Sequence, residues 1–203
     1  MDAWWPVAFA CPSSVVAAMA DRVLILDRDG VINEDSDNYI KGPEEWRPIP
    51  GSIDAIARLC HGGYRICVAS NQSGIGRRLF GLDQLNAIHQ RLREFLAKQG
   101  GQVELIAFCP HSPADACLCR KPRPGLLLEI GLRIGISLEN VPYVGDSIVD
   151  VEAARAAGMS PWLVSTGKGE QTLASARDRL DGVLIFRDLS AVADHVLGSG
   201  LQA

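Results

Sequence analysis

The chain has 203 residues, of which 47% are hydrophobic, and a formal net charge of −4. This composition is ordinary for a globular protein and excludes general disorder, collagen-like and coiled-coil architectures and a small disulfide scaffold. The acidic balance gives no reason to expect nucleic acid or an anionic membrane surface as a partner.

The chain begins with an apolar stretch, residues 4–20, which two prolines interrupt. At 17 residues it is shorter than the roughly 20 that a membrane span requires. Small residues at its end resemble a signal-peptide cleavage site, but no lysine or arginine precedes the apolar run. We interpret residues 1–18 as a tail or a mis-assigned start ahead of a single domain, 19–203, and expect a cytoplasmic protein.

Short apolar runs alternate with segments of helical spacing along the rest of the chain. Runs that are apolar throughout are typical of strands buried on both faces of a parallel sheet. Strands are expected at 23–26, 66–69, 103–108, 142–145, 162–164 and 183–186. Helices are expected at 53–60, 84–99, 125–134, 147–157 and 189–197, with Ser52 and Asp83 as caps of the first two. The alternation predicts an α/β fold of three layers around a mostly parallel sheet.

Three apolar runs end in a side chain that carries a hydroxyl or a carboxylate: Asp27, Ser70 and Asp146. Ligands of an open parallel sheet bind in the crevice outside the carboxyl ends of the strands, so we expect these residues to meet there. Each could instead be only a helix cap. Their occurrence together, with Asp29 and Lys121 close to them in the pattern, favours a ligand site.

The segment Asp-Arg-Asp-Gly at 27–30 places two carboxylates two residues apart. Like charges so close ionise together only beside a cation, so Asp27 and Asp146 are expected to hold Mg²⁺. Asp29, farther from the metal, is expected to keep a proton. Different pKa values suit a nucleophile and a general acid, and attack of Asp27 on phosphorus would form an aspartyl phosphate. Ser70 and Lys121 would bind the phosphoryl oxygens.

A second cluster contains three cysteines and one histidine, Cys109, His111, Cys117 and Cys119. This set is a full tetrahedral complement for zinc, and four protein ligands make such a zinc structural. Reduced cysteines on a surface loop and a disulfide are the alternatives. A zinc would fix the loop 109–121 and direct Arg120 and Lys121 toward the crevice.

These motifs together resemble the haloacid dehalogenase (HAD) superfamily of hydrolases. The resemblance rests on 27–30, on Ser-Asn-Gln-Ser-Gly at 70–74, on the Cys/His cluster and on Val-Gly-Asp at 144–146. It implies a capless, Rossmann-like core with a zinc-stabilised loop, in which 33–50 and the zinc loop 109–121 cover the site. The stretches 33–39 and 71–77 are more similar to phosphatases of heptose bisphosphates than to histidinol-phosphate phosphatases, which remain the alternative.

The resemblance also implies roles for individual residues. Asp27 would be the nucleophile and Asp29 the general acid and base, with Mg²⁺ held by Asp27, the Asp29 carbonyl and Asp146. Ser70 and Lys121 would hold the phosphoryl group. Substrate would further contact Asp35, Asn71, Gln72, Ser73, Arg77, Arg120 and Ser147. A monomer that removes the C7 phosphate of a heptose 1,7-bisphosphate, for lipopolysaccharide or related glycans, is the implied function.

Two rivals come from other classes. A receiver-like signalling domain also holds an aspartyl phosphate with a hydroxyl and a lysine, but a general acid two residues from the nucleophile favours turnover. A zinc-stabilised binding module leaves the pair Asp27 and Asp29 unexplained. Other residues have simpler interpretations: Lys168 is a solvated loop lysine near the crevice, His89 a surface or boundary residue, and Trp46 and Tyr39 either pack the loop or touch substrate.

Overall fold

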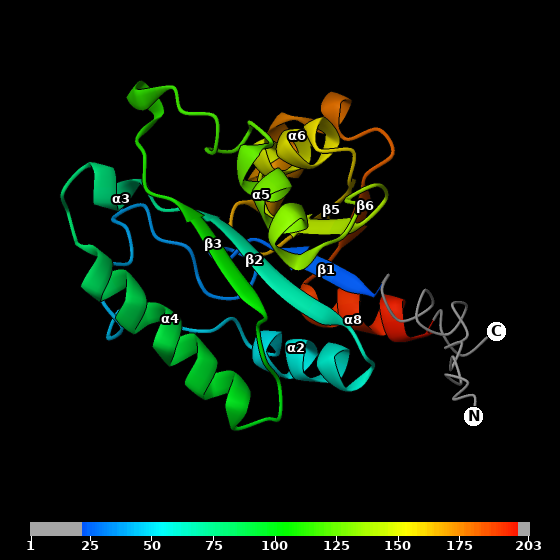
Figure 1. Ribbon diagram of the computed structural model, residues 1–203. Coiled ribbons are helices and arrows are strands. Elements are labelled where there is room, and N and C mark those ends of the chain that lie inside the picture. The colour runs from blue at the N-terminus through cyan, green and yellow to red at the C-terminus, as the bar shows by residue number, and fades with distance from the viewer. Residues whose placement is uncertain (1–21, 199–203) are drawn as a thin grey trace, which may run out of the picture.

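The computed structural model describes residues 22–198, so the interpretation of residues 1–18 concerns a part of the chain outside the described residues. Its centre is a six-stranded sheet in the order β3-β2-β1-β4-β5-β6 (Figure 1). All pairings between these strands are parallel, which confirms the predicted sheet. The strands are β1 (Val23–Leu26), β2 (Arg65–Asn71), β3 (Leu105–Cys109), β4 (Pro142–Gly145), β5 (Ser160–Val164) and β6 (Leu184–Phe186).

Helices cover both faces of the sheet, with α2, α4 and α8 on one face and α5 and α6 on the other (Figure 1). The longer helices are α2 (Ser52–His61), α4 (Leu82–Ala97), α5 (Gly125–Ile134), α6 (Ile148–Ala156) and α8 (Leu189–Gly198). Two short helices, α3 (Ser73–Gly76) and α7 (Gly169–Ser175), were not predicted, because a helix of one or two turns is too short to show an apolar period. No described helix has the length and hydropathy of a membrane span.

The core has two halves because side chains of a strand alternate between the faces of the sheet. In β1, Leu24 and Leu26 belong to the half under α2, α4 and α8, whereas Val23 and Ile25 belong to the half under α5 and α6. All four side chains are buried. The strand is thus fixed on both faces, and this rigidity extends to Asp27, which follows it directly.

Glycines, and not the predicted side chains, precede α2 and α4. Gly51 and Gly81 occupy the N-cap positions, so the predicted capping roles of Ser52 and Asp83 are wrong. The Ser52 hydroxyl instead donates to the carbonyl of Ile32, at 2.6 Å. Before α4, the Gln84 side chain accepts the backbone N–H of Gly81. At α2 the Ser52 side chain thus joins the helix to the chain after β1 and does not cap the helix.

The loop 33–50 contributes to the core, although its sequence predicted no core element. Trp46 is fully buried and its ring meets Phe95 of α4 edge-on, with ring centres 5.5 Å apart. Ile40 is also buried. Trp46 therefore packs the loop, whereas Tyr39 lines the pocket described below. The packing role left open by the sequence is thus realised by Trp46, and contact of Tyr39 with substrate stays a prediction.

His89 of α4 is buried, which corrects its interpretation as a surface or boundary residue. Its ring lies beside Phe108, and Nε2 has no hydrogen-bond partner. Burial, together with the positive charges of Arg28 and Arg93, lowers the pKa of His89 to about 3. The folded protein therefore holds this imidazole neutral.

The neutral His89 is expected to destabilise the protein in acid. Below pH 6.5 the unfolded chain binds a proton at this imidazole that the folded state does not bind, so stability falls as the pH falls toward 3. This difference in proton binding lowers the free energy of unfolding by about 2 kcal/mol between pH 7 and pH 5. The free energy of unfolding, measured in urea at both pH values, is expected to fall less in His89→Gln than in wild type, and the difference is expected to be this amount. The control is His61→Gln, at an exposed position; equal losses in wild type and His89→Gln would contradict the assignment.

Candidate active site

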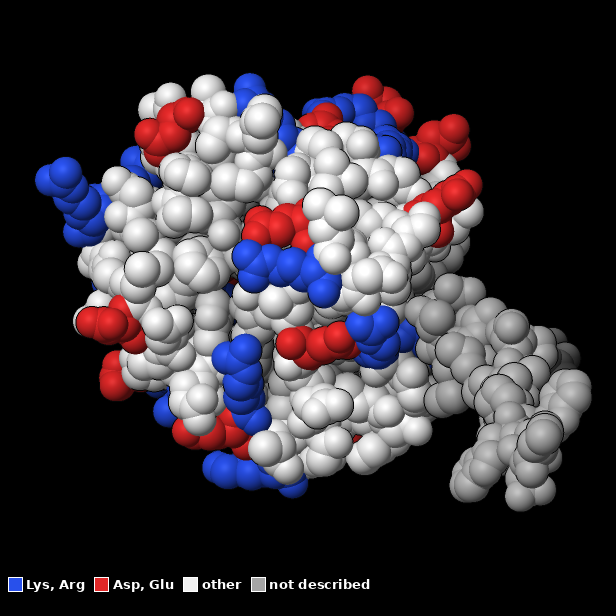
Figure 2. All heavy atoms as spheres, in the orientation of Figure 1, with Lys and Arg blue, Asp and Glu red and all other residues white. Residues whose placement is uncertain are grey.

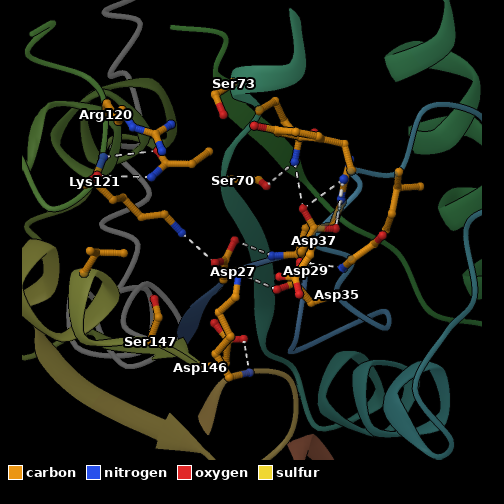
Figure 3. A pocket seen from close by; sticks show the side chains of 18 residues that line it. Asp27, Asp29, Asp35, Asp37, Ser70, Ser73, Arg120, Lys121, Asp146 and Ser147 are labelled. Carbon is orange, nitrogen blue, oxygen red and sulfur yellow. Dashed lines mark hydrogen bonds and ion pairs between the residues drawn. The ribbon is translucent and has the colours of Figure 1, made fainter. Parts of the chain in front are cut away.

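The polar residues that end β1, β2 and β4 lie together at one edge of the sheet, as the sequence predicted (Figure 3). They line a pocket of about 450 Å³. Its walls come from the strand ends, the loop 33–50, the zinc loop and the segment before α7. Predicted site residues in the lining are Asp27, Asp29, Asp35, Ser70, Asn71, Gln72, Ser73, Arg120, Lys121, Asp146 and Ser147.

Arg77, a predicted substrate contact, is not in that lining. It is exposed and forms the C-cap of α3, where its backbone N–H bonds to the carbonyl of Ser73. Ser73 at the start of α3 lines the pocket, whereas Arg77 follows the end of this short helix. The stretch 71–77 could be recognised from the sequence, but the short helix between Ser73 and Arg77 could not.

Three carboxylates, those of Asp27, Asp146 and Asp150, place oxygens within 4.8 Å of one another. Burial and the neighbouring Asp150 carboxylate raise the pKa of Asp146 to about 7. Burial also raises the pKa of Asp27 well above its usual value, against the lowering effect of Lys121. Crowded, buried oxygens of this kind are relieved by a divalent cation, so the donor set fits Mg²⁺.

Close backbone contact keeps this acidic site compact. Gly30 has φ +78°, and a Cβ there would lie 1.9 Å from Asp146 Oδ2. Gly167 has φ +58°, and a Cβ there would lie 2.2 Å from the same oxygen. Only glycine satisfies both the left-handed conformation and the space at these positions. The two loops therefore close around the Asp146 carboxylate.

Lys121 is buried between two of the carboxylates. Its Nζ lies 2.8 Å from Asp27 Oδ2 and 2.7 Å from Asp150 Oδ1, and it donates to Tyr143 Oη. These carboxylates outweigh burial and raise the pKa of Lys121, so its ammonium stays charged. Asn71 fixes the backbone of Lys121 by a reciprocal pair of hydrogen bonds, each 3.1 Å long. A cation is thus held beside the predicted nucleophile by the core of the protein.

Asp29 is held as a carboxylate, which differs from the predicted protonated group. Arg28 donates to both its oxygens, Asn33 donates to Oδ1 at 2.8 Å and Gln72 donates to Oδ2 at 2.8 Å. Burial alone would raise the pKa of Asp29, but Arg28 and these hydrogen bonds outweigh it, and the pKa lies below its usual value. Gln72 also donates to the Ser70 hydroxyl, at 2.8 Å, and so joins two predicted site residues.

Lys168 connects the Asp146 carboxylate with the loop 33–50. Its backbone N–H donates to Asp146 Oδ2 at 2.8 Å, and its Nζ lies 2.7 Å from Asp35 Oδ2. Lys168 lines the pocket, so the interpretation as a solvated lysine near the crevice describes its place but misses its partners. Its side chain is half-exposed.

The Cys/His cluster is assembled at the base of the zinc loop. The Sγ atoms of Cys109, Cys117 and Cys119 and the Nδ1 of His111 lie 3.3–3.6 Å from their neighbours. Ligands of a tetrahedral Zn²⁺ lie about 3.5–3.8 Å apart, so the donor set fits this ion. The cysteines are free, which removes the disulfide alternative. From this loop Arg120 extends toward the pocket, with Nη1 donating to the carbonyl of His111 (Figure 3).

Sequence reasoning missed Asp150, Arg28, Tyr143 and Asn33. A signal was present for Asp150, because it follows Ser147 by three positions at the start of a predicted helix, the spacing of a capping box that turns the carboxylate back to the helix N-terminus. Ser147 caps that helix and its backbone N–H donates to Asp150 Oδ2. Arg28 had no comparable signal: its position within a charged turn does not indicate that the guanidinium is buried.

Comparison with known proteins places this geometry in a family. A family model described as HAD-hydrolase-like matches residues 118–192. The D-glycero-beta-D-manno-heptose-1,7-bisphosphate 7-phosphatase of Pseudomonas aeruginosa is 56% identical over 179 residues, which cover 88% of this chain and 99% of that protein. The chain belongs to this HAD phosphatase family. The corresponding enzyme of Pseudomonas putida is 54% identical over 87% of the chain and 99% of its own length.

Solved structures of HAD heptose bisphosphate phosphatases share the fold. The Bordetella bronchiseptica enzyme, crystallised with magnesium and phosphate, has a TM-score of 0.85 and 48% identity, covering 88% of this chain and 99% of that one. The Burkholderia thailandensis enzyme has a TM-score of 0.69 and 40% identity, covering 87% and 98%. The HAD resemblance stated from the motifs is therefore confirmed.

Proposed function

We propose that this protein is a Mg²⁺-dependent phosphatase that removes the C7 phosphate of D-glycero-D-manno-heptose 1,7-bisphosphate. The observation that carries the proposal is the position of Asp27, which contacts the buried Lys121 ammonium and has a carboxylate oxygen within 4.8 Å of those of Asp146 and Asp150. The names of the close relatives support the heptose substrate. A product of this reaction would serve the synthesis of lipopolysaccharide precursors in the cytoplasm.

The first step transfers the phosphoryl group to the protein. An oxygen of Asp27 attacks the phosphorus, a P–O bond to Asp27 forms, and the bond between phosphorus and the C7 oxygen breaks. Lys121 and the Ser70 hydroxyl hold the phosphoryl oxygens and neutralise their charge. The leaving C7 oxygen takes a proton from Asp29.

The second step releases phosphate. A water molecule loses a proton to Asp29 and attacks the phosphorus, which breaks the bond to Asp27 and restores both carboxyl groups. Asp29 must therefore carry a proton when the sugar arrives. The negative charge of the bound phosphate favours protonated Asp29, and it opposes the effect of Arg28 and the hydrogen bonds that lower its pKa in the free protein.

Two metal ions complete the proposal. Mg²⁺, held by Asp27, Asp146 and the Asp29 carbonyl, supplies positive charge that keeps Asp27 ionised and neutralises the phosphate. Zn²⁺ on the Cys/His cluster is structural and keeps Arg120 directed at the substrate. The crystallised relative with magnesium and phosphate supports the first ion, and the spacing of the four donor atoms supports the second. We expect 19–203 to fold as one domain and to act as a monomer.

Side-by-side assays of two substrates test the proposal. Mg²⁺-dependent phosphate release is expected to be fast from heptose 1,7-bisphosphate and slow from histidinol phosphate. Preference for histidinol phosphate would keep the mechanism and reject the substrate. No turnover of either, with Asp27 still accepting phosphate from a small donor, would reject the phosphatase and favour a signalling domain.

A further inference from the structure

Four cations line the pocket among the described residues, and two of them are buried against carboxylates. Arg28 is bound to both oxygens of Asp29, and its Nη1, which has no hydrogen-bond partner, is itself buried. Lys121 is buried between Asp27 and Asp150. Arg120 and Lys168 remain for any anion other than the phosphoryl group that reacts. A bisphosphate brings a second phosphate into a pocket lined by five carboxylates, so one of these cations is needed to bind it.

Lys168 lies where two hollows of the surface meet. A second pocket, of about 490 Å³, adjoins the first and shares with it Asp35, Ser36, Asp37 and Lys168. Lys168 is the cation of this second lining, whose other charged members in the described chain are acidic. A molecule with one phosphate at Asp27 and another end in the second hollow would pass the Lys168 ammonium.

The backbone of Lys168 is fixed whereas its side chain is available. The hydrogen bond from its N–H to Asp146 Oδ2 ties the residue to the reacting edge of the sheet. The ammonium contacts Asp35 in a half-exposed ion pair, and such pairs contribute little free energy. Exchange of one Asp35 carboxylate for a phosphate dianion therefore costs little and gives the ammonium a stronger partner.

We propose that Lys168 determines specificity by binding the second phosphate of the substrate, the one that is not hydrolysed. This inference rests on the proposed function. On binding, the ammonium exchanges Asp35 for phosphate oxygens, which leaves Asp35 free to accept hydrogen bonds from sugar hydroxyls. No covalent step is involved.

Lys168→Met tests the inference, because methionine keeps much of the length of the side chain and removes the charge. The substrates are heptose 1,7-bisphosphate and heptose 7-phosphate, which lacks the second phosphate. For the bisphosphate, KM is expected to rise about 10- to 100-fold, as for loss of a charge-assisted hydrogen bond, with little change in kcat. For the monophosphate, both parameters are expected to stay close to wild type. Lys168→Arg is expected to restore most of the affinity for the bisphosphate.

Lys41→Met is the matched control, since Lys41 lies in the same loop as Asp35, is similarly exposed and is paired with Glu45, outside the pocket. The inhibition constant of inorganic phosphate, which binds at Asp27, is expected to stay unchanged in Lys168→Met. Equal losses for both substrates would overturn the inference and make Lys168 a clamp on the loop. Unchanged kinetics for both would also overturn it. Failure of wild type to hydrolyse the bisphosphate would instead reject the proposed function.

Discussion

Replacing Asp27 by asparagine is expected to lower the rate of phosphate release by at least about 10³-fold, because an amide cannot replace the carboxylate as the nucleophile. Asparagine has nearly the same shape, and its carbonyl oxygen can still accept a hydrogen bond from Lys121. The loss is therefore one of chemistry and not of folding. The measurement is kcat for heptose 1,7-bisphosphate at saturating Mg²⁺, together with the thermal midpoint of unfolding.

The structure also predicts the stability of Asp27→Asn. Asp27 is buried among other carboxylates, and its pKa is raised well above the usual value by burial. Removal of one crowded charge offsets the loss of its ion pair with Lys121. The thermal midpoint of Asp27→Asn is therefore expected to stay well above the assay temperature, so unfolding does not account for the lost activity. Asp83→Asn, at an exposed carboxylate of α4, is the control. Retention of more than a tenth of the activity by Asp27→Asn would exclude Asp27 as the nucleophile.

The central strands were predictable because strands buried on both faces consist of continuous apolar residues, whereas β6 is apolar but largely exposed at the edge of the sheet. β1 and β4 are short and buried along most of their length, so the apolar pattern alone places their ends, and with them Asp27 and Asp146, at one edge of the sheet. The ends of helices were less predictable. Gly51 and Gly81 precede α2 and α4 although polar candidates follow each of them, since a cap depends on where the preceding chain comes from.

The site was predictable where chemistry requires several groups in one pattern, and less so where a single side chain acts through its surroundings. The Cys/His cluster could be recognised because its four possible metal ligands lie close together in the sequence. Arg28 and Lys168 could not, because the same residues in a turn are usually solvated, and only the fold shows that one is buried against Asp29 and the other paired with Asp35. The ionised state of Asp29 was also beyond the sequence, since it depends on the buried Arg28 and on hydrogen bonds from Asn33 and Gln72, which come from separate segments.

Removal of zinc is expected to impair substrate binding more than the chemical step, because the two cations at the end of the zinc loop are held differently. Arg120 is only partly buried, and its side chain donates to the carbonyl of His111, so its position depends on the cluster. Lys121, the next residue, is held by Asn71 and by its two carboxylate partners in the core. Loss of a zinc ion bound there would therefore release Arg120 and leave Lys121 in place.

Cys117→Ala, or chelation of the bound metal, is expected to lower kcat/KM for the bisphosphate by about 10- to 100-fold, the scale of a reacting group misplaced by about 1 Å. Most of this change is expected in KM. The thermal midpoint is also expected to fall, because zinc bound only by the folded chain stabilises it. Metal content, measured by elemental analysis alongside the kinetics, shows whether the ion is lost.

Cys60→Ala provides the control for the zinc experiment. The Cys60 thiol lies on α2, bonds to the carbonyl of Gln102 and has no part in the cluster, so this variant is expected to keep its zinc and its kinetics. A metal-free protein with the kcat/KM of wild type would show that the loop holds Arg120 without zinc. A loss confined to kcat would show instead that the cluster acts through Lys121, which would mean that Asn71 and the two carboxylates do not suffice to fix it.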